Sequence, residues 1–319
     1  WARFDGDDAR LRDRDAFRRA RLGFKVKADR WQLVAEHDLA DRTPPDAYLE
    51  LTPADGHSLR IGQFKQPFLL EDAVSDKHSP LLEQALTGVF AISRRVGIEY
   101  ACHARWGTLN AAAFGQRLDG TSESTGVAAR ATWLLRERDG EILHVGGGIA
   151  SESPDARRAS FSATPGSALT DMRLAGTGRI GDVDRIDRAA LEALWLRDAW
   201  SLQGELVQVR VQRDGADFSG DAQSLLFTWS PTGDARRYRR GVVVAPTTDD
   251  GAAWEFALRW SAIDLDDDAI AGGKVRNLGI GATYYANAHL RIAANLVGSA
   301  RAGADDRPLV AELRVQLSY

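Results

Sequence analysis

The chain has 319 residues, of which 44% are hydrophobic and 27% charged, and its formal net charge is -4 at pH 7. This balance argues against wholesale nucleic-acid binding. The single cysteine, Cys102, excludes an internal disulfide framework and a thiolate metal cluster. No run of residues approaches the roughly 18 consecutive apolar positions that a membrane-spanning helix requires.

Short segments in which apolar and polar residues alternate recur from one end of the chain to the other. Successive side chains of a strand point to opposite faces, so each segment predicts a β-strand with one apolar and one polar face. No sustained helical period is present, and the predicted fold class is all-β. In chain order the clearest expected strands cover residues 21–27, 31–36, 47–52, 59–62, 95–103, 127–133, 254–260, 278–284, 290–296 and 309–319.

The last expected strand alternates without a break and ends on the aromatic Tyr319. Such a terminal segment is typical of the closing strand of an outer-membrane β-barrel, whose outer face is apolar, whose lumen is polar and whose interfaces carry aromatic girdles. The alternative is the last strand of a soluble β-sandwich, which also alternates.

The expected connections alternate in length. Tight turns at 28–30 and 54–57 alternate with longer links at 6–16, 41–46 and 66–92. Short periplasmic turns and long external loops are the asymmetry of an outer-membrane barrel, and roughly 20 residues per strand plus link predict 16 antiparallel transmembrane strands. We expect a single domain over residues 1–319. No signal peptide is visible at Trp1, so we expect it to have been removed or to lie outside this sequence.

The longest early link, residues 66–92, combines turn residues with apolar ones such as Phe68, Leu81 and Phe90. An exposed loop is rarely so apolar. Non-helical backbone at membrane depth must be buried in protein or line a water-filled cavity. We therefore expect this segment to fold inward as a constriction loop, the alternative being a loop that packs over the barrel mouth.

Strand parity predicts which basic residues face the lumen, and nearly all of them are arginines. If the apolar residues of 21–27 face lipid, then Arg19, Arg21 and Lys25 face inward. Converging guanidinium groups would guide anions through bidentate contacts with their oxygens. The alternative is that they pair with inward carboxylates of neighbouring strands. The same parity sends Arg60, Arg95, Arg130, Arg259 and Arg291 inward, together with Glu36, Glu50, Glu99, Glu192, Glu205, Glu255 and Glu312.

Patterns typical of enzymes and metal sites are weak. The glycine-rich residues 176–181 fit a dinucleotide fingerprint by letter, but no strand-to-helix context surrounds them. The six histidines lack metal-ligand spacing, and the aspartates at 264–268 are interpreted as a solvated loop rather than a calcium site. We expect no catalytic residue, no metal and no cofactor.

Several short motifs resemble the phosphate-selective porin O and P family, and they follow one another in the family's order. Residues 1–6 (WARFDG) and 17–24 (FRRARLGF) are similar to its opening hairpin. Each motif is short, but together they span nearly the whole chain. The others are 62–68 (GQFKQPF), 95–98 (RVGI), 232–236 (TGDAR) with Tyr238, 253–260 (AWEFALRW) and 284–287 (YYAN).

The resemblance implies a homotrimer of 16-stranded barrels in the Gram-negative outer membrane, surrounded by lipid and passing phosphate or related anions by diffusion. Arg3, Arg18 and Arg19 fall on motifs whose arginines help to form the narrow anion site, and Lys65 and Arg95 are candidates beside the constriction loop. The family's periplasmic lysines have few counterparts here, and the first strand looks truncated at Trp1.

The prediction is an anion porin, with no enzymatic activity and no nucleic-acid partner. Its candidate pore-lining residues are Arg3, Arg18, Arg19, Arg21, Lys25, Lys65, Arg95, Arg130 and Arg259. Two alternatives remain open: a porin for other small solutes such as dicarboxylates, and a plugged structural or adhesive barrel.

Overall fold

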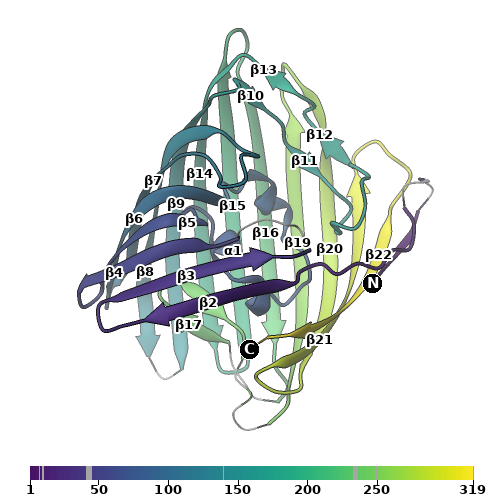
Figure 1. The fold of residues 1–319 in the computed structure, drawn as a ribbon. Coiled ribbons are helices and arrows are strands. Elements are labelled where there is room, and N and C mark those ends of the chain that lie inside the picture. The colour runs from purple at the N-terminus through teal and green to yellow at the C-terminus, as the bar shows by residue number, and fades with distance from the viewer. Residues whose placement is uncertain are drawn as a thin grey trace.

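The computed structural model describes the chain from residue 1 to 319 except residues 7, 9, 10, 41–44, 139, 233–235, 247, 249, 250 and 319. Its main element is a 16-stranded sheet in which neighbouring strands are antiparallel (Figure 1). The sheet confirms the predicted all-β class and strand number. The predicted links at 6–16 and 41–46, the motif at 232–236 and the terminal Tyr319 lie partly or wholly outside the described residues.

From its second strand to its last the sheet runs in sequence order, apart from short strands that lie outside it, and its first strand pairs with its last. Its first half contains β1 (Ala2–Asp5), β2 (Arg21–Lys27), β3 (Trp31–Asp38), β4 (Ala47–Ala54), β5 (His57–Lys65), β6 (Arg94–Ala104), β7 (Gly107–Phe114) and β8 (Ser124–Arg138). Its second half contains β9 (Glu141–Pro154), β14 (Val183–Arg197), β15 (Trp200–Arg213), β16 (Phe218–Trp229), β19 (Ala253–Asp266), β20 (Ala271–Tyr285), β21 (Leu290–Arg301) and β22 (Leu309–Leu317).

The two ends of the sheet are β1 and β2, and the link between them pairs back onto β1. An isolated antiparallel bridge joins Ala2 to Arg14, with mutual backbone hydrogen bonds of 2.8 and 3.0 Å. Among the described residues, no helix is long and apolar enough to span a membrane.

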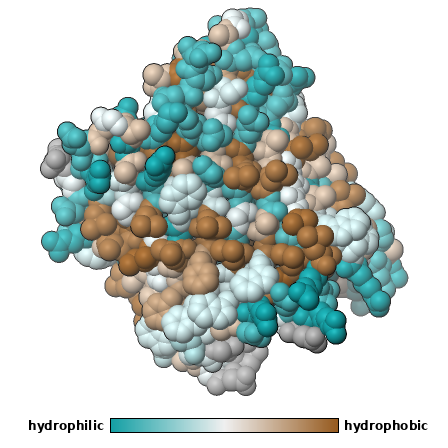
Figure 2. Space-filling model, turned by 180° about the vertical axis from the view of Figure 1, so that it is seen from behind, coloured by the Kyte–Doolittle hydropathy of each residue, from teal (hydrophilic) through white to brown (hydrophobic). Residues whose placement is uncertain are grey.

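The outer face of the sheet is apolar, as the alternation predicted. Leu22, Ile149, Leu191 and Leu317 are each about two-thirds exposed, and Figure 2 shows a hydrophobic band with hydrophilic residues above it. Tryptophans gather near the tight turns, where ring pairs such as Trp106 with Trp133 and Trp200 with Trp229 lie 5.5 Å apart. A membrane-facing belt with an aromatic girdle has this composition.

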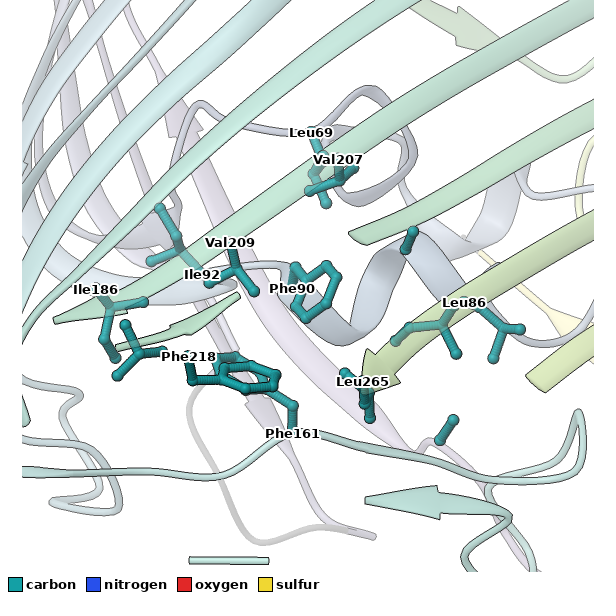
Figure 3. Packing of buried hydrophobic residues seen from close by; sticks show 14 of the residues in the cluster. Leu69, Leu86, Phe90, Ile92, Phe161, Ile186, Val207, Val209, Phe218 and Leu265 are labelled. Atoms are coloured by element: carbon teal, nitrogen blue, oxygen red, sulfur yellow. The ribbon is translucent and has the colours of Figure 1, made fainter. Parts of the chain in front are cut away.

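The inner face is covered by the connection between β5 and β6. It contains α1 (Leu70–Ala73) and the 3-10 helices η1 (Asp76–His78) and η2 (Leu86–Phe90). Phe90 is fully buried and packs edge-on against Phe161, with ring centroids 5.3 Å apart (Figure 3). Phe161 belongs to the connection between β9 and β14, which holds β10 (Arg158–Ala159), β11 (Ser162–Ala163), β12 (Ala175–Gly176) and β13 (Ile180–Gly181). The main hydrophobic core therefore lies inside the barrel, and residues 66–92 fold inward as predicted.

A second inward element enters from the side of the tight turns. The connection between β16 and β19 contains β17 (Arg237–Arg239) and β18 (Val242–Val244), which pair as a small antiparallel hairpin. We call residues 236–245 the lumen hairpin. Its Val243 is buried in a cluster with Leu194 and Leu196 of β14. The sequence pattern did not predict this hairpin, because three-residue strands are too short to show a period.

Candidate functional site

The constriction loop, residues 66–92, is bound to one side of the barrel wall by buried charged side chains. The Glu205 carboxylate accepts the backbone N–H of Leu70 at 2.7 Å and that of Glu71 at 3.2 Å. Arg259 donates to the carbonyls of Glu83 at 2.7 Å and Gln84 at 3.2 Å. The loop would otherwise leave these backbone groups unpaired at membrane depth, so these contacts fix its path across the lumen.

The tip of the loop is bound further along the wall. Arg291 of β21 donates to the carbonyls of Lys77 and Ser79, both at 2.7 Å. At the loop's origin, the Lys65 ammonium donates to the carbonyls of Asp72 at 2.6 Å and Val74 at 3.2 Å.

The opposite side of the loop faces basic residues in and before β2. Arg18 donates to both carboxylate oxygens of Glu83, at 2.7 and 2.8 Å. Arg19 forms a close ion pair with Asp76, and a nitrogen of Arg21 lies 3.7 Å from the same carboxylate. Burial raises the pKa of Asp76, but Arg19, followed by Lys65 and Arg21, outweighs it and holds the pKa below its ordinary value. The loop thus spans the lumen between β21 and the start of β2.

Two of the predicted arginines serve the wall rather than the open pore. Arg130 is 5% exposed and forms a bidentate pair with Glu192 at 2.6 and 2.8 Å. Arg95 donates to the carbonyls of Ile92 and Arg94 and lies 3.8 Å from Glu152. For Arg95 and Arg130 the structure favours the alternative given by the sequence analysis, in which inward arginines pair with carboxylates rather than contact the solute.

Lys25 and Arg3 differ in the face they occupy. Lys25 lies opposite Val34 in the β2–β3 ladder, on the inward face, and makes no hydrogen bond or ion pair within the described part of the chain. Arg3 lies opposite Ala311 of β22, whereas its neighbour Ala2 lies opposite the inward Glu312. Opposed residues share a face, so Arg3 points outward and the prediction that it lines the pore is wrong.

Cations on the lumen hairpin were not among the predicted pore-lining residues. Tyr238 packs its ring against His144 of the wall, with centroids 5.5 Å apart. Strand alternation therefore directs Arg237 and Arg239 to the opposite side, into the lumen. Both are exposed, and neither bonds to another residue of the described ranges. The available signal was the run of arginines ending in Arg240 and Gly241, whose φ angles of 49° and 79° suit a two-residue hairpin turn.

A further inward cation lies on the last strand. Arg314 of β22 has its Nε and Nη2 buried without a hydrogen-bond partner in the described structure. Its parity was visible in the sequence, but nothing there distinguished it from arginines that pair with carboxylates. No group of three or more His, Cys, Asp or Glu side chains in the described ranges is arranged to hold a metal ion.

The arrangement resembles known channels. A family model described as phosphate-selective porin O and P matches residues 1–319. A search of curated protein sequences finds no match.

Solved structures share the fold at low sequence identity. A loop-deletion form of OmpT, an outer membrane protein of Vibrio cholerae, is 11% identical with a TM-score of 0.61, covering 97% of this chain and 94% of that one. A trimer form of OmpT is 11% identical with a TM-score of 0.55, covering 93% of this chain and 91% of that one. An anion-selective porin from Comamonas acidovorans is 11% identical with a TM-score of 0.52, covering 91% of this chain and 84% of that one.

Proposed function

Because the chain belongs to the phosphate-selective porin O and P family, we propose that it is an outer-membrane porin in which arginines favour phosphate among the small anions that diffuse through. The observation that carries the proposal is an imbalance of partners at the constriction. All four acidic residues of the constriction loop have a cationic partner: Glu71 with Arg259, Asp72 with Lys65, Asp76 with Arg19, and Glu83 with Arg18.

Several inward cations have no such partner. Lys25, Arg237, Arg239 and Arg314 make no hydrogen bond or ion pair with any residue that the structure describes. A solute that passes the constriction loop therefore meets carboxylates that are paired with cations, and cations that have no partner. This surplus lowers the cost of partly dehydrating an anion and raises it for a cation.

The paired arginines add selectivity without trapping the solute. A guanidinium group recognises the oxygens of phosphate or a carboxylate through parallel hydrogen bonds. Arg18, Arg19 and Arg21 are only partly exposed and already bound to carboxylates, so an anion competes for their N–H groups and is held weakly. Conduction requires binding of this kind, strong enough for entry and weak enough for release.

The candidate residues thus divide into two groups. We propose that Arg18, Arg19, Arg21 and Lys25 contact the passing anion, and that the lumen-hairpin arginines extend this path toward the periplasm. In a second group, Lys65, Arg95, Arg130 and Arg259 position the loop and wall. The trimer form of the OmpT neighbour supports a homotrimer, and we propose that outer-membrane lipid surrounds it.

The test is a reversal-potential measurement on the purified protein in a planar bilayer with a potassium chloride gradient. We expect anion preference, block of the chloride current by inorganic phosphate, and a several-fold weaker block in the Arg18→Ala/Arg19→Ala double variant. The Arg136→Ala variant is the control, because its exposed pair with Glu141 lies at the tight turns.

Each other outcome removes part of the proposal. Cation preference would contradict it. Block by dicarboxylates but not by phosphate would assign a different solute. The two inward elements also suit a plugged structural barrel, and an absence of conductance would support that alternative.

A further inference from the structure

The constriction loop and the lumen hairpin touch each other at His78. The backbone N–H of Ala245 donates to Nδ1 of the His78 ring at 3.3 Å. Arg236 donates from Nη2 to the His78 carbonyl at 2.9 Å. Both ends of the hairpin therefore contact the last residue of η1.

The rest of the hairpin is attached to the wall on two sides. At its base, Arg236 forms a bidentate pair with Glu255 of β19, at 2.5 and 3.0 Å. At its turn, the Gly241 carbonyl accepts a hydrogen bond from Arg130 of β8 at 2.7 Å. The strands β19 and β8 are separated by four strands of the sheet, so the hairpin runs across the lumen as a strap.

The bond at Ala245 depends on the protonation state of His78. A neutral imidazole can accept at Nδ1, whereas an imidazolium carries protons on both nitrogens and only donates. Protonation would therefore place the Nδ1–H of His78 and the backbone N–H of Ala245 in repulsive contact, and the hydrogen bond would be lost. It would also add a positive charge beside Lys77 of η1, Arg236 and Arg237 of the hairpin, and Arg291 of β21. Within this cluster the Glu255 carboxylate is already held by Arg236.

We propose that His78 is a proton-sensitive tie between the constriction loop and the lumen hairpin, and that its protonation releases the Val244–Ala245 end of the hairpin and widens the pore. Burial, followed by Lys77, Arg236, Arg291 and Arg237, lowers the pKa of His78 to about 4. The tie is therefore intact near neutral pH and is lost as the pH falls through about 4.

Pore width is read most directly with uncharged solutes, since a new charge on His78 alone would alter ion currents. Proteoliposomes that contain the wild-type protein are compared at pH 7 and pH 3.5 for swelling in a pentose and in a disaccharide. We expect the disaccharide rate to rise several-fold in acid relative to the pentose rate. The His78→Ala variant should show the high rate at both pH values.

The matched control is His57→Ala, because His57 is bonded to the Tyr100 hydroxyl at 2.7 Å and lies on the outer face of the sheet, in line with Cys102 and the exposed Leu109. It should behave as the wild type does. An acid rise that persists in His78→Ala, or a wild-type ratio that does not change with pH, would overturn the proposal. Migration of unheated samples on a gel checks that each variant is folded.

A cross-link tests the same position by replacing the hydrogen bond with a covalent bond. In a Cys102→Ser background, His78→Cys and Ala245→Cys should join under mild oxidation, as measured by mass. The joined channel should show the low disaccharide rate at both pH values, and a reductant should raise that rate at both, as in His78→Ala. A joined channel that still widens in acid, or cysteines that do not join, would contradict the tie. The sugar assay does not depend on ion preference, so failure of the proposed anion selectivity leaves this result interpretable.

Discussion

Replacement of Arg259 by glutamine should release the constriction loop without unfolding the barrel. Arg259 is 4% exposed and binds two loop carbonyls as well as the Glu71 carboxylate, at 3.2 Å. Loss of one member of a buried ion pair costs about 3–5 kcal/mol. The backbone ladder between β19 and β20 involves no Arg259 side-chain atom, so this cost should weaken the attachment of the loop rather than the sheet.

A loss of about 3 kcal/mol raises the fraction of time that the loop is detached by roughly 100-fold, since each 1.4 kcal/mol is a factor of ten. The assay is amide hydrogen exchange of peptides from residues 66–92, alongside single-channel conductance. Exchange of these peptides should accelerate by about that factor, and current noise should increase, while strand peptides remain protected.

The control variant is Arg136→Gln, which breaks the ion pair between Arg136 and Glu141. The Arg136 side chain is 56% exposed, and such a surface pair contributes at most about 1 kcal/mol. Loop exchange in Arg259→Gln equal to that of the wild type would refute the reasoning, because the loop would then be held by its other contacts alone. The double variant with Glu71→Gln separates the ion pair from the two carbonyl contacts.

Two further substitutions test solute binding at the loop tip and the steric limits of the sheet. Asp76→Asn removes the carboxylate that occupies two arginines at the loop tip, so phosphate block of the chloride current should tighten by about two- to five-fold, in line with a partly exposed pair; weaker block would show that Asp76 does not compete with the solute. Gly107→Ala should sharply lower the yield of folded protein, because φ is 147° and the new Cβ would meet the Thr132 carbonyl oxygen at 1.9 Å. Gly181→Ala, with open space around it, is the control, and equal folded yields on unheated gels would contradict the steric argument.

The positions of the strands and the face that each side chain occupies could be predicted, because both depend on a period of two that continues over many residues. Lys25 and Arg130 face inward as that period requires, with Phe24 and Val127 outward. Arg3 failed because its inward role came from a motif rather than from parity, and the short β1 takes its register from β22. Register with a strand some 300 residues away leaves no mark in a six-residue motif.

The division of the arginines into free and paired could not be predicted. Parity states which face a side chain occupies, but not whether a carboxylate lies within reach. Arg130 finds Glu192 from β14, although β9 separates their two strands in the sheet. Arg259 finds the loop only because residues 66–92 fold back across the lumen. Such pairings depend on the curvature of the sheet and the path of the loop, which no local pattern encodes.

The pairing pattern has a consequence for how selectivity is produced. If the loop carboxylates were free, the lumen would place negative and positive charges on facing sides, and anions and cations could both find a path. Here Asp76 and Glu83 are each bound to an arginine, so the loop contributes little net charge. Under the proposed function, selectivity then depends on cations outside the loop, such as the exposed Lys25 and Arg237. The loop's own contribution is width, and the two properties should respond to different substitutions.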